Sequence, residues 1–224
     1  ISMKQKCAQK AFEMIQDKKV VGLGGGSTVA LLIREISGSG KQVRAVTPSQ
    51  DTMELCAEYG IPVQALEMTS RIDIAFDGCD EVDLELNALK SCGGIHTREK
   101  IMAAMADEHI LLADEGKLKE KLEFGFPVTV EVLRPARQYV KNCLEKMGAE
   151  VKERRSDQKA GLVISDDGNY LMEAHFPQAE DAKALSDRLD RIPGIAGHSL
   201  FCGIAAKAVI VKENGIDIIE KEKS

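Results

Sequence analysis

The first half of the chain alternates between two spacings of its apolar residues. Between residues 4 and 16 they recur at helical intervals, and the apolar run at 20–23 then suits a buried strand. Further helices are expected from Ser27 to the Gly38-Ser39-Gly40 loop, between Thr47 and Gly60, and over 97–106, and further strands over 42–46, 61–66, 72–76 and 109–113. Strands that are regularly separated by helices predict a doubly wound, mostly parallel α/β sheet of Rossmann-like type, which binds ligands beyond the carboxyl ends of its strands.

The spacing changes after Phe126. Strands are expected over 128–132, 151–155, 161–164, 170–174 and 195–201, and helices over 136–147 and 182–192. This βαββαβ order, with one extra hairpin arm, predicts a ferredoxin-like α+β subdomain. The tail has apolar runs at 208–211 and 216–219 around Asn214-Gly215, which predict a closing hairpin that returns to the first sheet. We therefore expect a Rossmann-like domain over 1–126 and 203–224 and a ferredoxin-like subdomain over 127–202.

Composition narrows the classes of partner. The chain of 224 residues carries 36 acidic and 30 basic side chains, and its formal charge of −6 gives no general attraction to nucleic acid. It has no Trp and only 4% aromatic residues, so base-stacking platforms are not expected either. The sequence contains no run of about 20 apolar residues, which a membrane-spanning helix needs. We therefore expect a cytoplasmic protein that binds neither nucleic acid nor a membrane.

The six cysteines are scattered singly along the chain. No Cys-x-x-Cys pair and no His cluster at zinc spacing accompanies them. Free thiols in a reducing compartment are therefore the expected state.

A glycine-rich loop follows the first predicted strand and opens the next helix. In Gly22-Leu23-Gly24-Gly25-Gly26-Ser27-Thr28, the glycines let the backbone approach a ligand, and the free N–H groups at the helix start favour an anion. The two hydroxyls add donors, so a phosphate is the expected ligand. The loop lacks the Gly-Lys-Ser/Thr of a Walker loop, and no acidic residue clearly ends the next strand as in a dinucleotide site. A tight turn required by packing alone is the alternative.

A second segment places several carboxylates at the end of a predicted strand. The apolar run 72–76 leads into Asp77-Gly78-Cys79-Asp80-Glu81-Val82-Asp83. Carboxylates at the carboxyl end of a parallel strand lie where ligands bind, and they suit the hydroxyl groups of a sugar. A Mg²⁺ site is a rival interpretation, although no His or further carboxylate completes a recognisable ligand set, and solvated loop acids are a third.

Two further segments carry lysines. Lys90 and Glu99 flank a glycine-containing loop that enters a helix, but Glu99 could equally be a capping-box partner of Thr97 or a surface ion-pair residue. His96 is a candidate general base, yet a histidine in this position more commonly satisfies a local hydrogen bond. Lys117 follows a predicted strand, where a solvated lysine is the default interpretation.

The order of these segments along the chain identifies a protein family more specifically than any one segment does. The glycine loop 24–28, the segment 77–81, Lys90 with its glycine loop, Arg98-Glu99-Lys100, Asp114-Glu115-Gly116-Lys117 and the run 126–132 together resemble type A ribose-5-phosphate isomerase. The resemblance covers nearly the whole chain, including the βαββαβ insertion and the Ile192-Pro193-Gly194 turn. It implies interconversion of ribose 5-phosphate and ribulose 5-phosphate in the pentose phosphate pathway, without metal or organic cofactor, by a homodimer or homotetramer.

The resemblance also assigns site residues by position. Glu99 aligns with the catalytic glutamate of the family, and the other catalytic positions fall on Asp77, Asp80 and Lys90. The substrate-binding positions fall on Gly25, Gly26, Ser27, Thr28, Gly78, Cys79, Ser91, Cys92, Gly93, Lys117 and Lys4. Gly25 stands where the family usually has Thr. Ser91 and Cys92 occupy two glycine positions, and if these positions have positive φ, the side chains carry a conformational cost that could shift the loop.

The implied reaction explains why such groups are needed. An aldose–ketose isomerase removes a weakly acidic C2 proton from the open-chain aldehyde, stabilises an enediolate and returns the proton to C1. Glu99 is the expected base. Lys90, loop N–H groups or a protonated aspartate would stabilise the enediolate, and Asp77 or Asp80 would move protons between O1 and O2. The hydroxyls of the glycine loop would bind the phosphate and so position the reacting carbons.

Two other functions use related features. A sugar-phosphate-sensing domain of a transcriptional repressor would bind the same ligand without turnover, and it normally adds a basic DNA-binding helical segment, which we do not expect here. A related acyl-transfer enzyme of coenzyme A would use a glutamate as nucleophile and should need neither the phosphate loop nor the lysine pair.

Overall fold

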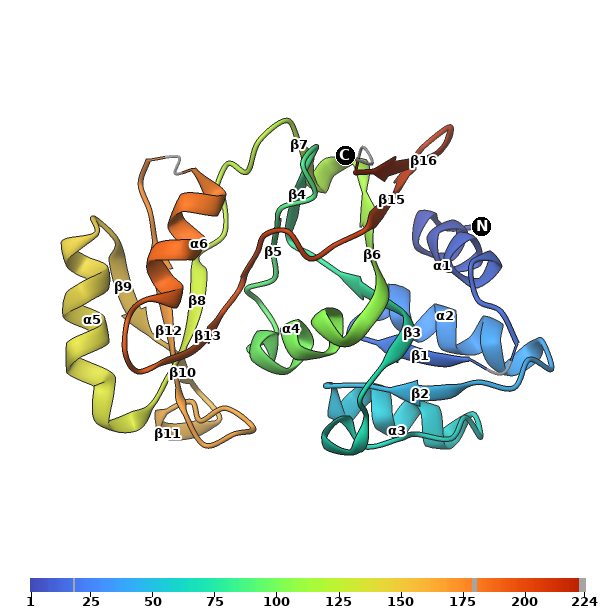
Figure 1. Cartoon of the computed structure of the whole chain (residues 1–224), viewed down its shortest axis with the longest axis horizontal. Helices are drawn as coiled ribbons and strands as arrows, with labels where there is room; N and C mark the ends of the chain where they lie inside the picture. Colours follow the sequence, from blue (N-terminus) through green and yellow to red (C-terminus); the bar gives the residue numbers. More distant parts are fainter. Residues whose placement is uncertain (18, 179–180, 222–224) are drawn as a thin grey trace.

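The computed structural model describes residues 1–17, 19–178 and 181–221, which form two α/β units with a small third sheet between them (Figure 1). The larger unit is built on a six-stranded sheet with the order β16-β15-β6-β3-β1-β2. Its strands are β1 (Val20–Leu23), β2 (Arg44–Val46), β3 (Ile72–Gly78), β6 (Ala106–Asp114), β15 (Lys207–Lys212) and β16 (Gly215–Glu220). Its helices are α1 (Met3–Glu13), α2 (Ser27–Gly38), α3 (Gln50–Glu58) and α4 (His96–Met105).

Every neighbouring pair in this sheet is parallel except the hairpin of β15 and β16. Alternate residues of the strands point to opposite faces. Phe76 and Leu112 pack in one core cluster with residues of α1 and α2, whereas Ala75 packs on the other face with Met102 of α4. The predicted doubly wound, mostly parallel sheet is therefore confirmed, and so is the closing hairpin that returns to it.

The smaller unit contains an antiparallel sheet with the order β13-β8-β12-β9. Its elements are β8 (Val128–Val132), α5 (Arg137–Lys146), β9 (Glu150–Glu153), β12 (Tyr170–His175), α6 (Ala182–Asp190) and β13 (Ile195–His198), and its hairpin arm is β10 (Arg155–Ser156) with β11 (Lys159–Leu162). Val130, Leu144, Met172 and Leu185 belong to one core cluster, which also includes Leu89 and Leu200 outside this sheet. This is the ferredoxin-like arrangement predicted from the sequence. The domain boundaries at 126/127 and 202/203 stay a prediction.

The small third sheet has the order β14-β5-β4-β7 and was not predicted. Its strands are β4 (Glu81–Asp83), β5 (Ala88–Leu89), β7 (Leu118–Lys119) and β14 (Leu200–Phe201). Strands of two or three residues are too short to show a period of apolar positions. The expected strand 195–201 is divided, because β13 pairs with β8 whereas β14 pairs with β5. Parallel pairing of β4 with β7 joins the acidic segment after β3 to the lysine segment after β6.

Within the described residues, three short 3-10 helices complete the secondary structure: η1 (Leu66–Met68), η2 (Glu115–Lys117) and η3 (Arg134–Ala136). The strand expected over 61–66 is reduced to one parallel bridge from Val63 to Ala45.

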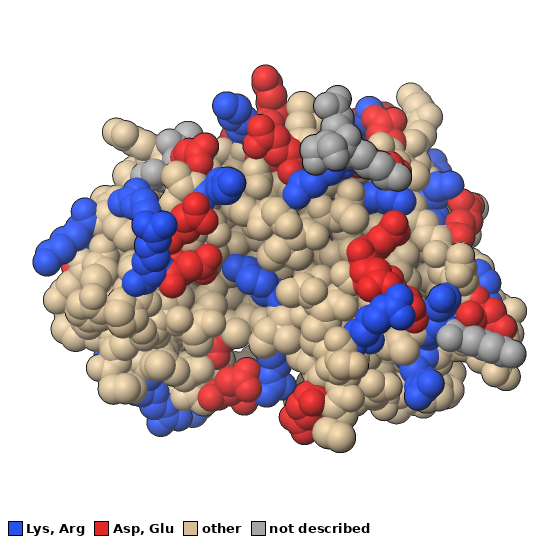
Figure 2. Space-filling model, in the orientation of Figure 1, with Lys and Arg blue, Asp and Glu red and all other residues tan. Residues whose placement is uncertain are grey.

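The surface has mixed charge on the face in Figure 2, where Lys and Arg side chains are interspersed with Asp and Glu. No helix in the described part of the chain is long and apolar enough to cross a membrane. All six cysteines lie within the described residues and are free thiols, as expected.

Candidate active site

The glycine loop lies at the carboxyl end of β1, directly beside the end of β3. The amide of Gly24 donates to the carbonyl of Phe76 (2.9 Å), which fixes the loop to the neighbouring strand. A Cβ atom at position 24 would overlap the carboxyl group of Asp77, so glycine at this position leaves room for the Asp77 side chain. Gly26 has φ +91° and is the N-cap of α2, and no described side chain caps that helix. The first amides of α2 are therefore left for an anion.

A cavity of about 300 Å³ opens above this loop, a volume at the lower end of the range for ligand pockets. Its lining contains fourteen of the fifteen residues that the sequence assigned to the site: Lys4, Gly25, Gly26, Ser27, Thr28, Asp77, Gly78, Cys79, Asp80, Lys90, Cys92, Gly93, Glu99 and Lys117. Ser91 does not line it. Two apolar residues, Ile95 and Leu112, line it without having been expected, because an apolar side chain beside a motif carries no chemical signal of its own.

Three charged side chains meet at the base of the cavity. The ammonium of Lys90 lies 2.7 Å from Oε2 of Glu99 and 2.9 Å from Oδ2 of Asp77, and it donates to the carbonyl of Gly78 at 2.5 Å. All three charged residues are buried. Asp77 comes from β3, Lys90 from the loop after β5 and Glu99 from the first turn of α4, so the fold joins three segments into one cluster.

Burial and mutual contact shift the acidity of these groups. Burial raises the pKa of the Glu99 carboxyl to about 8, the charge of Asp77 adds to this rise, and the ammonium of Lys90 opposes it. Burial by itself lowers the pKa of Lys90, but the carboxylates of Asp77 and Glu99 outweigh this and hold that pKa above its ordinary value. Lys90 is thus a fixed cation beside a carboxylate that can hold or release a proton near neutral pH.

The structure decides between the interpretations of Glu99. The N-cap position of α4 is Ile95, and no described side chain caps this helix. Glu99 points to Lys90 instead, and it is buried in the cluster. The capping-box and surface ion-pair interpretations are therefore wrong. His96 is also buried, and burial lowers its pKa to about 4. Its Nε2 lies 3.3 Å from the carbonyl oxygen of Gly197, so it has a hydrogen-bond partner as expected, although that partner is 101 residues away and not local.

Asp80 has different partners from Asp77. Its Oδ2 accepts hydrogen bonds from the backbone amides of Ser91 (2.6 Å) and Cys92 (3.2 Å). The carboxylate therefore links the end of β3 to the loop in which Ser91 and Cys92 occupy the two glycine positions. Asp80 also lines the cavity, on the side of that loop.

The side chain of Ser91 points away from the cavity into the protein. It is 1% exposed, and its hydroxyl donates to the carbonyl of Pro127 and lies 3.1 Å from the Ser199 hydroxyl. The only described non-glycine residues with positive φ are Leu86 and Phe124, so the cost considered for Ser91 and Cys92 does not arise. Ser91 fits its position because its hydroxyl has buried acceptors there.

Two lysines lie in the wall of the cavity on the side of the glycine loop. Lys4 comes from α1 and Lys117 from η2, and both line the space together with Ser27 and Thr28. Two ammonium groups and the start of α2 therefore concentrate positive potential in one part of the cavity, although the chain as a whole has a net charge of −6.

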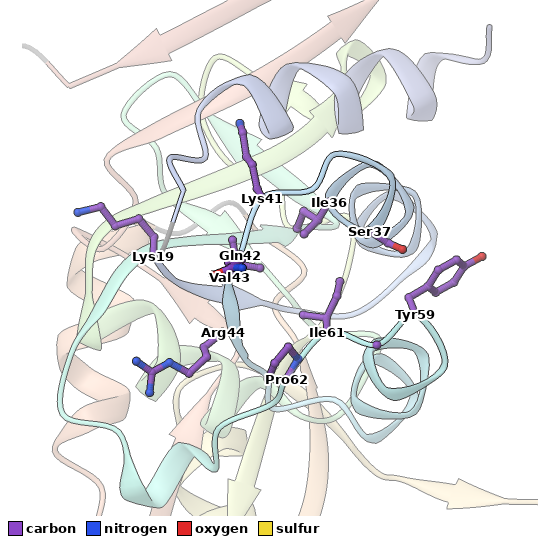
Figure 3. Close-up of a pocket in the computed structure, with 11 residues that line it drawn as sticks. Lys19, Ile36, Ser37, Lys41, Gln42, Val43, Arg44, Tyr59, Ile61 and Pro62 are labelled. Atoms are coloured by element: carbon purple, nitrogen blue, oxygen red, sulfur yellow. The ribbon is translucent and has the colours of Figure 1, made fainter.

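A second cavity, of about 660 Å³, lies at the amino-terminal ends of β1 and β2 (Figure 3). Its basic residues are Lys19, Lys41 and Arg44, and in Figure 3 the side chains of Lys41 and Arg44 point away from each other. The ammonium of Lys41 donates to the carbonyl of Ile15 (2.6 Å) and lies over the Phe12 ring. No carboxylate lines this cavity in the described part of the chain, so the groups for proton transfer gather at the other end of the sheet.

The fold and the first cavity define a class of protein: a Rossmann-like α/β protein in which an uncapped helix start and a buried cluster of two carboxylates and a lysine line the same cavity. The family model of ribose 5-phosphate isomerase A (phosphoriboisomerase A) matches residues 44–215, and the chain belongs to this family of isomerases.

Related sequences and solved structures of this family match the chain along nearly its full length. The ribose-5-phosphate isomerase A of Methanothermobacter thermautotrophicus is 40% identical over 98% of both chains, and that of Haloquadratum walsbyi is 38% identical over 96% of this chain and 92% of the relative. The structure of ribose 5-phosphate isomerase A from Methanocaldococcus jannaschii has a TM-score of 0.91 at 36% identity, covering 98% of each chain. A D-ribose-5-phosphate isomerase in complex with phospho-erythronic acid has a TM-score of 0.92 at 34% identity, again over 98% of each chain.

Proposed function

We propose that this protein interconverts D-ribose 5-phosphate and D-ribulose 5-phosphate as an aldose–ketose isomerase, through an enediolate and with Glu99 as general base. The observation that carries the proposal is the buried cluster of Asp77, Lys90 and Glu99 in the same cavity as the glycine loop. The names of the relatives support the choice of substrate.

The phosphate is assigned to the start of α2. Ser27, Thr28 and the free amides there supply donors, and Lys4 and Lys117 supply charge. Gly25 offers no hydroxyl, and a Cβ at this position would have its nearest neighbours in Ser49 at 3.7 and 3.8 Å. Binding the phosphate here holds the sugar chain at one end, so its C1 and C2 can be placed against the carboxylate cluster.

Glu99 removes the C2 proton and returns it to C1. Its carboxyl pKa, which burial raises to about 8, makes it a stronger base than an exposed glutamate, since basicity follows pKa. The ammonium of Lys90 lies within hydrogen-bond distance of this carboxylate and is already desolvated, so it can stabilise the negative charge that grows on the enediolate oxygens. General-base action of this kind contributes about 10²–10⁴ in rate.

We assign to Asp77 the transfer of a proton between O1 and O2 of the sugar. The same carboxylate could also assist the opening of the sugar ring. It shares Lys90 with Glu99, whereas Asp80 already accepts two backbone amides. We assign to Asp80 the orientation of the loop at 91–92 and contact with sugar hydroxyls. Asp77 and Asp80 thus divide between them the roles that the sequence left open.

The complex of a related isomerase with phospho-erythronic acid supports this chemistry. That ligand is a phosphorylated sugar acid, whose carboxylate carries negative charge next to the carbon chain as an enediolate does. We further propose that the reaction needs no metal or organic cofactor, that it serves the pentose phosphate pathway in the cytoplasm, and that the protein works as a homodimer or homotetramer.

A coupled assay of ribose 5-phosphate conversion by the purified chain tests the proposal. We expect turnover by the wild type, a loss of about 10²–10⁴ in kcat for Glu99→Gln, and unchanged kcat for Glu120→Gln, which removes an exposed carboxylate outside the cavity. A wild type that binds the sugar phosphate without converting it would support a sensing domain instead, and one that binds coenzyme A would support an acyl-transfer enzyme. Near-normal turnover by Glu99→Gln would remove this residue from the role of base.

A further inference from the structure

One arginine of the ferredoxin-like unit reaches the loop that closes the cavity. Arg154 lies between β9 and β10, and its Nη2 donates to the carbonyl of Ser91 (2.9 Å) while its Nη1 donates to that of Cys92 (3.3 Å). Neither the sequence motifs nor the resemblance pointed to this residue. Arg154 does not line the cavity, so any influence on the reaction passes through the loop.

The backbone groups of Ser91 and Cys92 are held from both sides. Their N–H groups donate to the carboxylate of Asp80, and their C=O groups accept from the guanidinium of Arg154. The first anchor belongs to the Rossmann-like unit and the second to the ferredoxin-like unit. The loop that carries Lys90 at its start therefore has its geometry fixed by both units.

The guanidinium is itself held in place. Its Nε donates to Oε1 of Glu173 (3.1 Å), and its Nη2 lies 3.0 Å from the same oxygen. The backbone amide of Arg154 donates to the carbonyl of Leu171 in β12 (2.9 Å). A planar guanidinium can serve a carboxylate and two carbonyls at once, which the single ammonium of a lysine cannot do with the same geometry.

The loop is shaped to accept this side chain. Gly94 has φ +71°, and a Cβ atom at this position would lie 2.6 Å from Nη1 of Arg154 and 3.0 Å from Cδ1 of Leu171. Close packing of the guanidinium on the loop backbone therefore requires glycine at 94, independently of its φ.

We propose that Arg154 is a positioning residue, through which the ferredoxin-like unit fixes the loop at 91–94 and thereby the placement of Lys90 and of the substrate. This inference rests on the proposed isomerase function for its kinetic consequence only. Loss of the guanidinium leaves the carbonyl of Cys92 and the carboxylate of Glu173 without this donor, and it leaves the carbonyl of Ser91 with the Thr129 hydroxyl alone (3.0 Å). The loop then samples positions in which the cavity is wider.

Kinetics of Arg154→Gln provide the first test, with Arg155→Gln as matched control. Arg155 is the next residue, is exposed and does not contact the loop, so the control removes the same charge at nearly the same place. We expect kcat/KM for ribose 5-phosphate to fall about 10–100-fold in Arg154→Gln, with the larger part in KM, and to stay at the wild-type value in the control. Arg154→Lys should recover part of the loss.

Hydrogen exchange at the amides of Ser91 and Cys92 provides a readout that does not depend on the isomerase activity. We expect about tenfold faster exchange there in Arg154→Gln, with unchanged exchange in β1 and β3. Glu173→Gln, which keeps the guanidinium but weakens its anchor, should move both readouts in the same direction by less. Unchanged exchange at 91–92 overturns the proposal, and so does a loss of activity accompanied by faster exchange throughout both units. Faster exchange at 91–92 in a chain without isomerase activity would uphold the positioning role and reject the proposed function.

Discussion

Gly24 lies so close to the carboxyl group of Asp77 that a single added methyl group would overlap it. This contact sets the position of Asp77, which in turn lies 2.9 Å from the ammonium of Lys90. The glycine loop thus has two tasks. It leaves the first amides of α2 uncapped, and it leaves room for the acid that pairs with Lys90.

Gly24→Ala should therefore damage the carboxylate cluster directly. The new Cβ atom must displace Asp77, which is buried and short, so we expect a loss of about 100-fold in kcat and about 1–3 kcal/mol in the free energy of unfolding. Gly25→Ala is the matched comparison, because its Cβ would find its nearest neighbours at 3.7 and 3.8 Å. We expect its melting temperature to stay near the wild-type value and its kcat to fall far less. Equal effects of the two substitutions would contradict the proposed role of the contact.

The pH dependence of the reaction should follow Glu99. The carboxylate is the active form of the base, and burial raises the pKa of Glu99 to about 8. The value of kcat/KM should therefore rise with pH, and the midpoint of this rise should lie near pH 8. A pH–rate profile of the free enzyme measures this midpoint. A midpoint in the ordinary range of glutamate, below about 6, would contradict the assignment.

The raised pKa of Glu99 should also make the free energy of unfolding depend on pH. The folded-state pKa of Glu99 lies above the ordinary value of 4.5, so the folded protein binds the extra proton between about pH 4.5 and 8. Its contribution to stability is complete below pH 4.5 and is lost as the pH rises through about 8. Melting temperatures of wild type and Glu99→Gln across this window should therefore differ in slope, with the steeper fall in the wild type. Parallel curves would argue against the raised pKa.

Activity should survive exhaustive treatment with EDTA. The ammonium of Lys90 stands between the carboxylates of Asp77 and Glu99, in the place where a divalent cation would bridge them. In the proposed mechanism, the charge that stabilises the enediolate is thus supplied by the chain itself. Dialysis against EDTA followed by the coupled assay measures this, and a loss that Mg²⁺ or Mn²⁺ restores would revive the metal interpretation of the acidic segment.

Replacing the two unusual loop residues by glycine should have unequal effects. Ser91→Gly removes a buried hydroxyl that contacts Pro127 and Ser199, and we expect it to cost about 2 kcal/mol of unfolding free energy. Cys92 is exposed and its thiol has a single described side-chain contact, with Asp80, so Cys92→Gly should cost mainly the backbone entropy of glycine, about 0.5–1 kcal/mol. Urea denaturation of both variants provides the comparison. Equal losses would show that the inward contacts of Ser91 contribute little.

The sequence by itself determined the fold class and most of the cavity lining. Apolar periodicity is a local property, so helices and strands of four or more residues could be placed from it, and their alternation left few ways to arrange the sheet. Glycines and charged groups at strand ends are local as well. Parallel strands bring the ends of β1 and β3 to one edge, and the family resemblance added the positions on helices and on the loop at 90–93. Fourteen of the fifteen residues assigned in this way surround one space.

Tertiary structure alone decided which way each of these side chains points and what it contacts. Ser91 turns inward because acceptors from Pro127 and Ser199, 36 and 108 residues further along the chain, lie beneath it. Asp80 is drawn to the loop amides rather than to Lys90, and Arg154 arrives from a unit that the motifs do not include. The small sheet of β4, β5, β7 and β14 likewise exists only through pairing between distant segments. Hydrogen-bond partners that are far apart in sequence leave no local pattern, and so only the folded chain could reveal them.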